Sequence, residues 1–430
     1  MNYQQRLLKA IPGGAHTYSR GFDQFPINAP PILARGKGAY VYDAKDKCYL
    51  DYGMALRAVN IGYAEDEIDS AAIAQIHNGN NLTRASLIEL EAAELIIDLI
   101  DSVDMVKFTK NGSTSVSAAV KLSRAYTGRE MVARCADHPF FSYDDWFIGS
   151  TPLTLGIPQE TIDKTKKFRY NDIESLENLI EKYPDQFACV ILEPASTEEP
   201  KDNFLLKVQN LCKKHGIVFV LDEMITGFRW HMKGAQHIYN VTPDLCAFGK
   251  AMANGFSVSC VAGKREIMEL GSIEFEGRER LFLLSTTHGA EMSGLGAFVA
   301  TMKFMQKNNV VEHLWDYGQK LINIIQKQAD AHGISQNFKV GGAACSPYYL
   351  TLDESGVNSL PLRTLFSQEM IRNGVLMPWL ALSFRHGEDE LVMTENALNS
   401  AFTVYRKALN QGVEKYLEGS IIKPVFRKHN

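Results

Sequence analysis

Hydrophobic and polar positions alternate along this chain with two periods, one typical of strands and one typical of helices. Short apolar runs at 103–108, 189–192, 217–221 and 245–249 have the length and composition of buried strands. Apolar residues recur at helical spacing over 85–100, 111–128 and 205–216. Strands that alternate with helices predict an α/β fold with a mostly parallel sheet, right-handed crossovers and flanking helices.

The two ends of the chain have a different pattern from the middle. The stretch RGKGAYVYDAKDKCYLDYG at 35–53 predicts a short β-meander with an Asp-Lys turn. After about residue 301 long helical patterns dominate, and a strand, YYLTL, lies at 348–352. We therefore expect an N-terminal segment at 1–62 that packs with a small domain, a large domain at 63–310 and a small C-terminal α+β domain at 311–430.

Composition excludes several classes of protein. The net charge is −5, with 45 basic and 50 acidic residues, which disfavours nucleic-acid binding and a polybasic membrane anchor. The seven cysteines include no C-x-x-C pair, so no metal site is indicated. The N-terminus lacks an apolar signal-peptide core, and no apolar run approaches the roughly 18 residues of a membrane span. We expect a soluble, cytoplasmic protein.

Polar side chains follow the apolar runs of the expected sheet. Glu193, Asp222 and Lys250 come directly after three of these runs, and a turn at 110–114, KNGST, follows the fourth and opens a helix. Each feature alone is also typical of a helix cap, a surface ion pair or a solvated lysine. Together they meet the needs of pyridoxal phosphate, because a helix N-terminus binds phosphate, a carboxylate pairs with a protonated pyridine nitrogen, and a desolvated lysine forms an imine.

Five segments resemble the class III aminotransferases of fold type I, and within them the glutamate-1-semialdehyde aminomutase branch. They are IPGGAHTYSRGF at 11–22, NGSTSVSAAVKLSRAYTGR at 111–129, LDEMITGFRW at 221–230, GAQHIYNVTPDLCAFGKAMANG at 234–255 and STTHGAE at 285–291. The resemblance extends from about residue 11 to 386. It implies a fold type I transferase with a seven-stranded-type sheet, with 63–310 as the domain that binds pyridoxal phosphate. It also implies a homodimer that shares its active sites.

The resemblance also implies roles for residues around the cofactor ring. Lys250 would carry the cofactor as a Schiff base and move the proton between carbons, and Asp222 would hold the pyridine nitrogen protonated. Met224 would lie against one face of the ring. Phe140 would supply the stacking aromatic ring, and Glu193 would lie near the hydroxyl side of the pyridine.

The phosphate and the substrate take further residues by the same resemblance. The turn of Asn111, Gly112 and Ser113 would bind the phosphate, and Thr287 would complete that site from the partner subunit. Arg20 aligns with the arginine that takes the substrate carboxylate in the aminomutase branch, and Arg57 is a second candidate for that role.

Three departures from the family pattern bear on the reaction. The family's Tyr-His-Gly is Phe-Phe-Ser at 140–142, its Ser-Gly-Thr-Glu is Asn-Gly-Ser-Thr at 111–114, and the glutamate of the aminomutase branch is missing from MPWLALSFRHG at 377–387. We therefore expect an aminotransferase that moves an amino group from an amino-acid donor, such as glutamate, to an aldehyde or ketone. A sugar-derived carbonyl, such as an oxidised octulosonate of surface-polysaccharide biosynthesis, is the specific expectation.

Two alternatives stay open. The first is glutamate-1-semialdehyde 2,1-aminomutase itself, which shares the cofactor. The second, from another class, is a catalytically inactive scaffold or regulator on the same fold. A nucleotide-dependent enzyme is disfavoured, because the chain contains neither G-x-G-x-x-G nor G-x-x-x-x-G-K-[ST].

Overall fold

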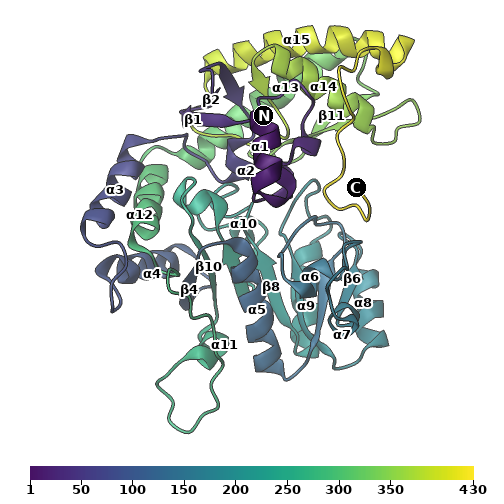
Figure 1. The fold of residues 1–430 in the computed structure, drawn as a ribbon. Coiled ribbons are helices and arrows are strands. Elements are labelled where there is room, and N and C mark those ends of the chain that lie inside the picture. The colour runs from purple at the N-terminus through teal and green to yellow at the C-terminus, as the bar shows by residue number, and fades with distance from the viewer. The chain divides into compact units, whose positions relative to one another are not determined.

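The computed structural model describes residues 1–430, and by internal contacts the chain divides into two compact units. The terminal unit combines Met1–Glu65 with Glu312–Asn430, and the large unit is Asp66–Val311. Figure 1 traces the chain through its helices and strands. None of the helices is both long enough and apolar enough to cross a membrane.

A seven-stranded sheet forms the centre of the large unit, in the order β4-β10-β9-β8-β7-β5-β6. Strands β5 to β9 pair in parallel, whereas β10 pairs antiparallel with both β4 and β9. The expected mostly parallel α/β fold is thereby confirmed. The strands are β4 (Met105–Thr109), β5 (Met131–Cys135), β6 (Thr165–Phe168), β7 (Phe187–Leu192), β8 (Val218–Asp222), β9 (Leu245–Phe248) and β10 (Ser259–Gly263).

Helices flank this sheet (Figure 1), which is why β7, β8 and β9 are buried along their whole length. The helices of the large unit are α3 (Asp66–His77), α4 (Leu87–Leu99), α5 (Gly112–Thr127), α6 (Asp145–Ile148), α7 (Gln159–Asp163), α8 (Ile173–Lys182), α9 (Phe204–His215), α10 (Ala235–Ile238), α11 (Arg265–Met268) and α12 (Met292–Lys307).

Helix α5 follows the rules for helix ends closely. The side chain of Asn111 accepts a hydrogen bond from the backbone N–H of Thr114 at 2.9 Å and so caps the first turn. At the other end Gly128 adopts φ 69°, the left-handed conformation that commonly closes a helix. Both ends are thus fixed by residues that the sequence alone identifies.

The terminal unit combines segments from both ends of the chain and contains helices and strands. Strand β13 (Val375–Leu376) pairs in parallel with β3 (Cys48–Asp51), which continues the meander of β1 (Leu33–Lys37) and β2 (Tyr40–Asp43). A separate hairpin joins β11 (Phe338–Gly341) to β12 (Tyr348–Thr351). The helices are α1 (Tyr3–Ala10), α2 (Met54–Arg57), α13 (Val310–Ala331), α14 (Leu360–Arg372) and α15 (Glu388–Gln411).

The short element α2 is a left-handed turn rather than an ordinary helix. Its four residues have φ values of 39°, 48°, 64° and 64°, and none is a glycine. A left-handed conformation costs an L-residue roughly 1–2 kcal/mol, and it normally occurs at single positions. The surrounding fold must therefore hold this turn in place.

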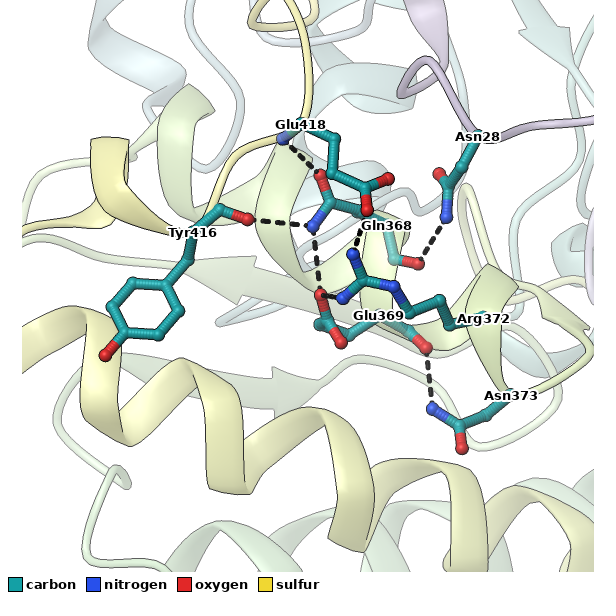
Figure 2. A network of polar contacts seen from close by, with 7 residues as sticks. All are labelled: Asn28, Gln368, Glu369, Arg372, Asn373, Tyr416 and Glu418. Atoms are coloured by element: carbon teal, nitrogen blue, oxygen red, sulfur yellow. Dashed lines mark hydrogen bonds and ion pairs between the residues drawn. The ribbon is translucent and has the colours of Figure 1, made fainter.

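The C-terminal tail beyond α15 is fastened to α14 by buried polar contacts (Figure 2). The Gln368 amide donates to the carbonyl of Tyr416 and accepts from the N–H of Glu418, both at 2.9 Å. The backbone carbonyl of Gln368 accepts from the Asn28 side chain at 2.9 Å, and Arg372 pairs with the Glu418 carboxylate. The Gln368 side chain, only 1% exposed, thus joins the C-terminal tail to α14. The backbone of the same residue binds Asn28 of the N-terminal segment.

Candidate active site

The carboxyl ends of three neighbouring parallel strands carry the side chains that the sequence singled out. Glu193 follows β7, Asp222 ends β8, and Lys250 lies two residues beyond β9. The pairing of β7 with β8 and of β8 with β9 places these ends at one edge of the sheet. Ligands of open α/β sheets bind at this edge.

Asp222 is a buried carboxylate whose charge interacts with that of a lysine. It is 2% exposed, and its Oδ1 accepts a hydrogen bond from the backbone N–H of Met224 at 2.9 Å. Burial raises the pKa of Asp222 to about 7, while the positive charge of Lys250 opposes that shift. A carboxylate in this setting is stabilised as an anion by any additional cation beside it.

Lys250 stands on a constrained piece of backbone. It is half-buried and has φ 46°, in the left-handed region that non-glycine residues rarely adopt. The preceding Gly249 leaves room for a neighbour, because a Cβ there would lie 2.6 Å from the Met224 Sδ. Such strain often marks functional sites, where the surrounding structure maintains it.

Met224 also fills the space above the phosphate turn. A Cβ on Gly112 would lie 2.7 Å from the same Met224 Sδ. Gly112, the first residue of α5, and Gly249, the residue before Lys250, therefore both pack against the side chain of Met224, two residues beyond β8. The Oγ of Ser113 accepts from the backbone N–H of Tyr143 at 3.1 Å, and the Asn111 amide oxygen caps the helix. The first N–H groups of α5 have no partner within the helix, which suits them to bind an anion.

The aromatic loop after β5 is tied to the same turn. The hydroxyl of Ser142 lies 3.0 Å from the Ser117 hydroxyl and donates to the Ser113 carbonyl at 3.3 Å. Phe140 is 45% exposed and has its edge against Phe147, whereas Phe141 is buried. Of the two phenylalanines, Phe140 is therefore the one with a ring face accessible to a ligand.

His138 is a site residue that the sequence did not single out for chemistry. It is 1% exposed, and its Nδ1 accepts the backbone N–H of Glu193 at 3.0 Å. Burial lowers the pKa of His138 to about 3, so the ring is neutral and carries its proton on Nε2, a buried atom without a hydrogen-bond partner. Its position just after β5, at the same sheet edge, was the available signal.

Thr287 lies in the same unit, on the exposed stretch before α12. Its carbonyl accepts from the Asn81 side chain at 3.0 Å. This stretch is anchored at Glu291, whose carboxylate pairs with Lys110 at 2.7 Å and accepts from Asn80 at 2.9 Å. Lys110 directly precedes the phosphate turn, so the turn and the stretch with Thr287 share one anchor.

Arg20 and Arg57 belong to the terminal unit. Arg20 is exposed, and its charge acts on the buried carboxylate of Asp51 in that unit. Arg57 is half-buried and ends the left-handed turn. The other nine candidate residues all lie in the large unit, namely Asn111, Gly112, Ser113, Phe140, Glu193, Asp222, Met224, Lys250 and Thr287.

The groups at the edge of the large unit suit pyridoxal phosphate. The glycine at 112 keeps the helix N-terminus open where a Cβ would collide with Met224. Asp222 offers a buried carboxylate for a pyridinium nitrogen, and Lys250 follows the neighbouring strand β9 at the same edge of the sheet. A phosphate cradle, a carboxylate and a lysine are the three groups that this cofactor requires.

Comparison with known proteins agrees with this geometry. Residues 26–355 match the family Aminotransferase class-III. A 3-aminobutyryl-CoA aminotransferase from Cloacimonas acidaminovorans (strain Evry) is 30% identical over 420 residues, which cover 95% of this chain and 98% of that protein.

Solved structures show the same fold. FumI from Sphingopyxis sp. MTA144, in its PLP internal aldimine form, is 25% identical with a TM-score of 0.86, covering 95% of this chain and 97% of that one. An omega-transaminase from Sphaerobacter thermophilus is 26% identical with a TM-score of 0.83, covering 94% and 97%. The chain therefore belongs to the class III aminotransferases and is a pyridoxal-phosphate-dependent enzyme.

Proposed function

We propose that this enzyme moves an amino group from glutamate to the carbonyl carbon of a second substrate, an aldehyde or ketone. Within that class we propose a sugar-derived acid, such as an oxidised octulosonate, as the acceptor. The observation that carries the catalytic part is the buried Asp222 at the end of β8, whose carboxylate interacts electrostatically with Lys250, two residues beyond the neighbouring strand β9. Both substrates of such an enzyme use one site in turn, which predicts ping-pong kinetics.

Pyridoxal phosphate supplies an electron sink that stabilises negative charge on the carbon that bears the amino group. In this proposal Asp222 stays ionised and holds a proton on the ring nitrogen through a charge-assisted hydrogen bond. Lys250 would take a proton from one carbon and return it to another, since it follows β9 at the carboxyl edge of the sheet. The first N–H groups of α5, with the Ser113 hydroxyl, hold the phosphate in place.

In this proposal an arginine orients the substrate. A guanidinium matches a carboxylate with two parallel hydrogen bonds. Arg20 is the first candidate because its side chain is exposed, and Arg57 is the second. The Phe140 ring would stack on the cofactor, since it is the accessible member of the Phe-Phe pair.

A second candidate substrate follows from the curated relative. That protein is a 3-aminobutyryl-CoA aminotransferase, so a β-amino acyl thioester is a competing donor. The aminomutase reaction is the third possibility. The absence from 377–387 of the glutamate that the aminomutase branch carries disfavours it. The three differ in their amino donor or in whether two substrates are needed.

We further propose that the working unit is a homodimer. Several large apolar side chains of the large unit are exposed in the single chain, which is typical of a surface that a partner covers. They include Ile73 at 52%, Ile76 at 53%, Leu87 at 88% and Leu90 at 57%. Sedimentation at assay concentration tests this proposal, and an active monomer would contradict it.

The reaction is tested with the purified enzyme loaded with pyridoxal phosphate. Glutamate alone should change the absorbance of the bound cofactor and release 2-oxoglutarate at about one equivalent per site. A panel of carbonyl acceptors, including sugar acids, then identifies the second substrate. If glutamate has no effect and 3-aminobutyryl-CoA does, the donor is the thioester. If glutamate-1-semialdehyde alone gives 5-aminolevulinate, the enzyme is the mutase.

The role of Lys250 has its own test. Borohydride should fix the cofactor on a peptide that contains Lys250, and labelling of Lys264 or any other lysine would refute the assignment. Lys250→Ala should still bind the cofactor through the phosphate turn while turnover falls by roughly four orders of magnitude or more. Lys264→Ala is the matched control, since that lysine pairs with Asp244 and should leave turnover intact.

A further inference from the structure

A buried carboxylate in the terminal unit holds the backbone that enters the left-handed turn. Asp51, at the end of β3, is 6% exposed. Its Oδ1 accepts the N–H of Gly53 at 2.7 Å, and its Oδ2 accepts the N–H of Met54 at 3.1 Å. The Tyr63 hydroxyl donates to the same Oδ2 at 2.6 Å.

Tyr63 holds the next residue of the turn, Ala55, by a further hydrogen bond. Its hydroxyl oxygen accepts the N–H of Ala55 at 2.8 Å while its proton is given to Asp51. On the other side, the Trp379 indole N–H donates to the Gly53 carbonyl at 3.0 Å. Three successive backbone N–H groups and one carbonyl are thus fixed, which explains how four non-glycine residues keep positive φ values.

Two arginines are connected with this carboxylate, Arg20 through its charge and Arg57 through the turn. Arg20 interacts electrostatically with both Asp51 and Tyr63, and it favours the ionised form of each. Arg57 is the last residue of the turn that Asp51 holds. The hydrogen bonds of Asp51 thus hold the backbone that leads to Arg57, and Arg20 adds a charge interaction with the same carboxylate.

We propose that Asp51, acting with Tyr63, is a positioning residue for substrate recognition that sets Arg20 and the Arg57 turn for binding a carboxylate. This inference rests on the proposed function, because it assigns Asp51 to the same substrate site. Asp51 acts on the substrate through the arginines and the turn. Its loss should weaken recognition of carboxylate-bearing compounds and leave reactivity toward compounds without a carboxylate.

The test compares two nucleophiles that would displace the Lys250 amine from the carbon that it binds on the cofactor. Aminooxyacetate carries a carboxylate, whereas O-methylhydroxylamine does not. In Asp51→Asn and in Tyr63→Phe the second-order rate for aminooxyacetate should fall about 10-fold or more, as for a lost charge-assisted contact. The rate for O-methylhydroxylamine should stay within about 2-fold, because it needs no arginine.

A second readout does not depend on the reaction. Removal of the Tyr63 hydroxyl deprives the Ala55 N–H of its acceptor, so amide hydrogen exchange over residues 53–57 should accelerate in Tyr63→Phe. Asp43→Asn is the matched control, because Asp43 also accepts two backbone N–H bonds, from Lys45 and Lys47, in the same unit. It should change neither the rate ratio nor exchange at 53–57.

The outcomes separate this inference from the proposed function. Equal losses with both nucleophiles, or no change with either, overturn the positioning role of Asp51. If Asp51→Asn does not fold, Tyr63→Phe decides the question, since it keeps the carboxylate. Arg20→Ala and Arg57→Ala could both keep the wild-type preference for aminooxyacetate. In that case neither arginine binds the substrate carboxylate, so that part of the proposed function fails, and this inference fails with it. If either arginine variant loses the preference and Asp51→Asn keeps it, only this inference fails.

Discussion

The left-handed turn can be tested by replacing one of its residues with glycine. Ala55 has φ 48° and ψ 48°, inside the turn, whereas Ala58, just after it, has φ −90° and ψ −11°. Both alanines are half-buried, so Ala55→Gly and Ala58→Gly remove the same methyl group from similar surroundings. The two variants differ mainly in the backbone conformation that the glycine adopts.

The expected magnitudes follow from that difference. Either substitution costs roughly 0.5–1 kcal/mol, because glycine gains freedom in the unfolded chain. Either also loses up to about 0.8 kcal/mol of methyl burial. Only Ala55→Gly recovers the roughly 1–2 kcal/mol of left-handed strain. Ala55→Gly should therefore be close to wild type in stability, and it should exceed Ala58→Gly by about 1–2 kcal/mol.

Calorimetric melting of both variants at one scan rate measures the difference. In a unit of this size each kcal/mol moves the melting temperature by about 2–4 °C, so the variants should melt about 2–8 °C apart. The backbone N–H of residue 55 is kept in both, which leaves its bond to Tyr63 in place. If Ala55→Gly melts at or below Ala58→Gly, the turn is not left-handed in solution and the strain argument fails.

Three further changes have equally definite outcomes. Gly318→Ala should abolish folding of the terminal unit, since the new methyl group would overlap the Ala344 carbonyl oxygen. Gly333→Ala is the control, because its methyl group meets no neighbour, and it should lower the free energy of unfolding in denaturant by only about 1–2 kcal/mol. Burial lowers the pKa of His386 from 6.5 to about 4, so the unfolded chain binds the proton first and stability should fall as the pH drops through that window. Between these two pKa values, the slope of the unfolding free energy against pH measures how many more protons the unfolded chain binds. In His386→Phe that number should be smaller by up to about one, and an unchanged slope would contradict the burial argument. Asp222→Asn should keep the fold and lower kcat about 100-fold or more in steady-state assays, and near-normal turnover would exclude its pairing with the ring.

The candidate active site at the sheet edge can be predicted from the sequence because its signals are local. Asp222 and Lys250 interrupt or follow runs of apolar residues, and in a parallel sheet the polar residue that ends such a run reaches the carboxyl edge. The phosphate turn was equally accessible, since Asn111 and the small residues after it match the chemistry of a helix start. These predictions needed no knowledge of distant contacts.

Elements defined by tertiary contacts were missed. Strand β5 contains Arg134, which reads as a surface residue, yet its guanidinium is buried and donates to Ser150 at 2.8 and 3.1 Å. The sequence MALR at 54–57 has the composition of an ordinary right-handed helix, since alanine, leucine, methionine and arginine all favour one. Its left-handed form depends on Asp51 and on Tyr63, eight residues beyond Ala55, a contact that no local propensity encodes.

The role of Ser142, which departs from the family pattern, becomes clear only from its contacts in the fold. In sequence, a serine in place of glycine reads as a lost turn residue. In the fold its hydroxyl contacts Ser117, the Ser113 carbonyl and the N–H of Asp144, so one atom joins the aromatic loop to α5. Because α5 also begins at the phosphate turn, the position of the Phe140 ring is coupled to the phosphate cradle. The Phe-Phe-Ser variant therefore has a hydrogen-bonded serine where the family has a glycine, and Phe140, two residues before it, remains an accessible aromatic ring.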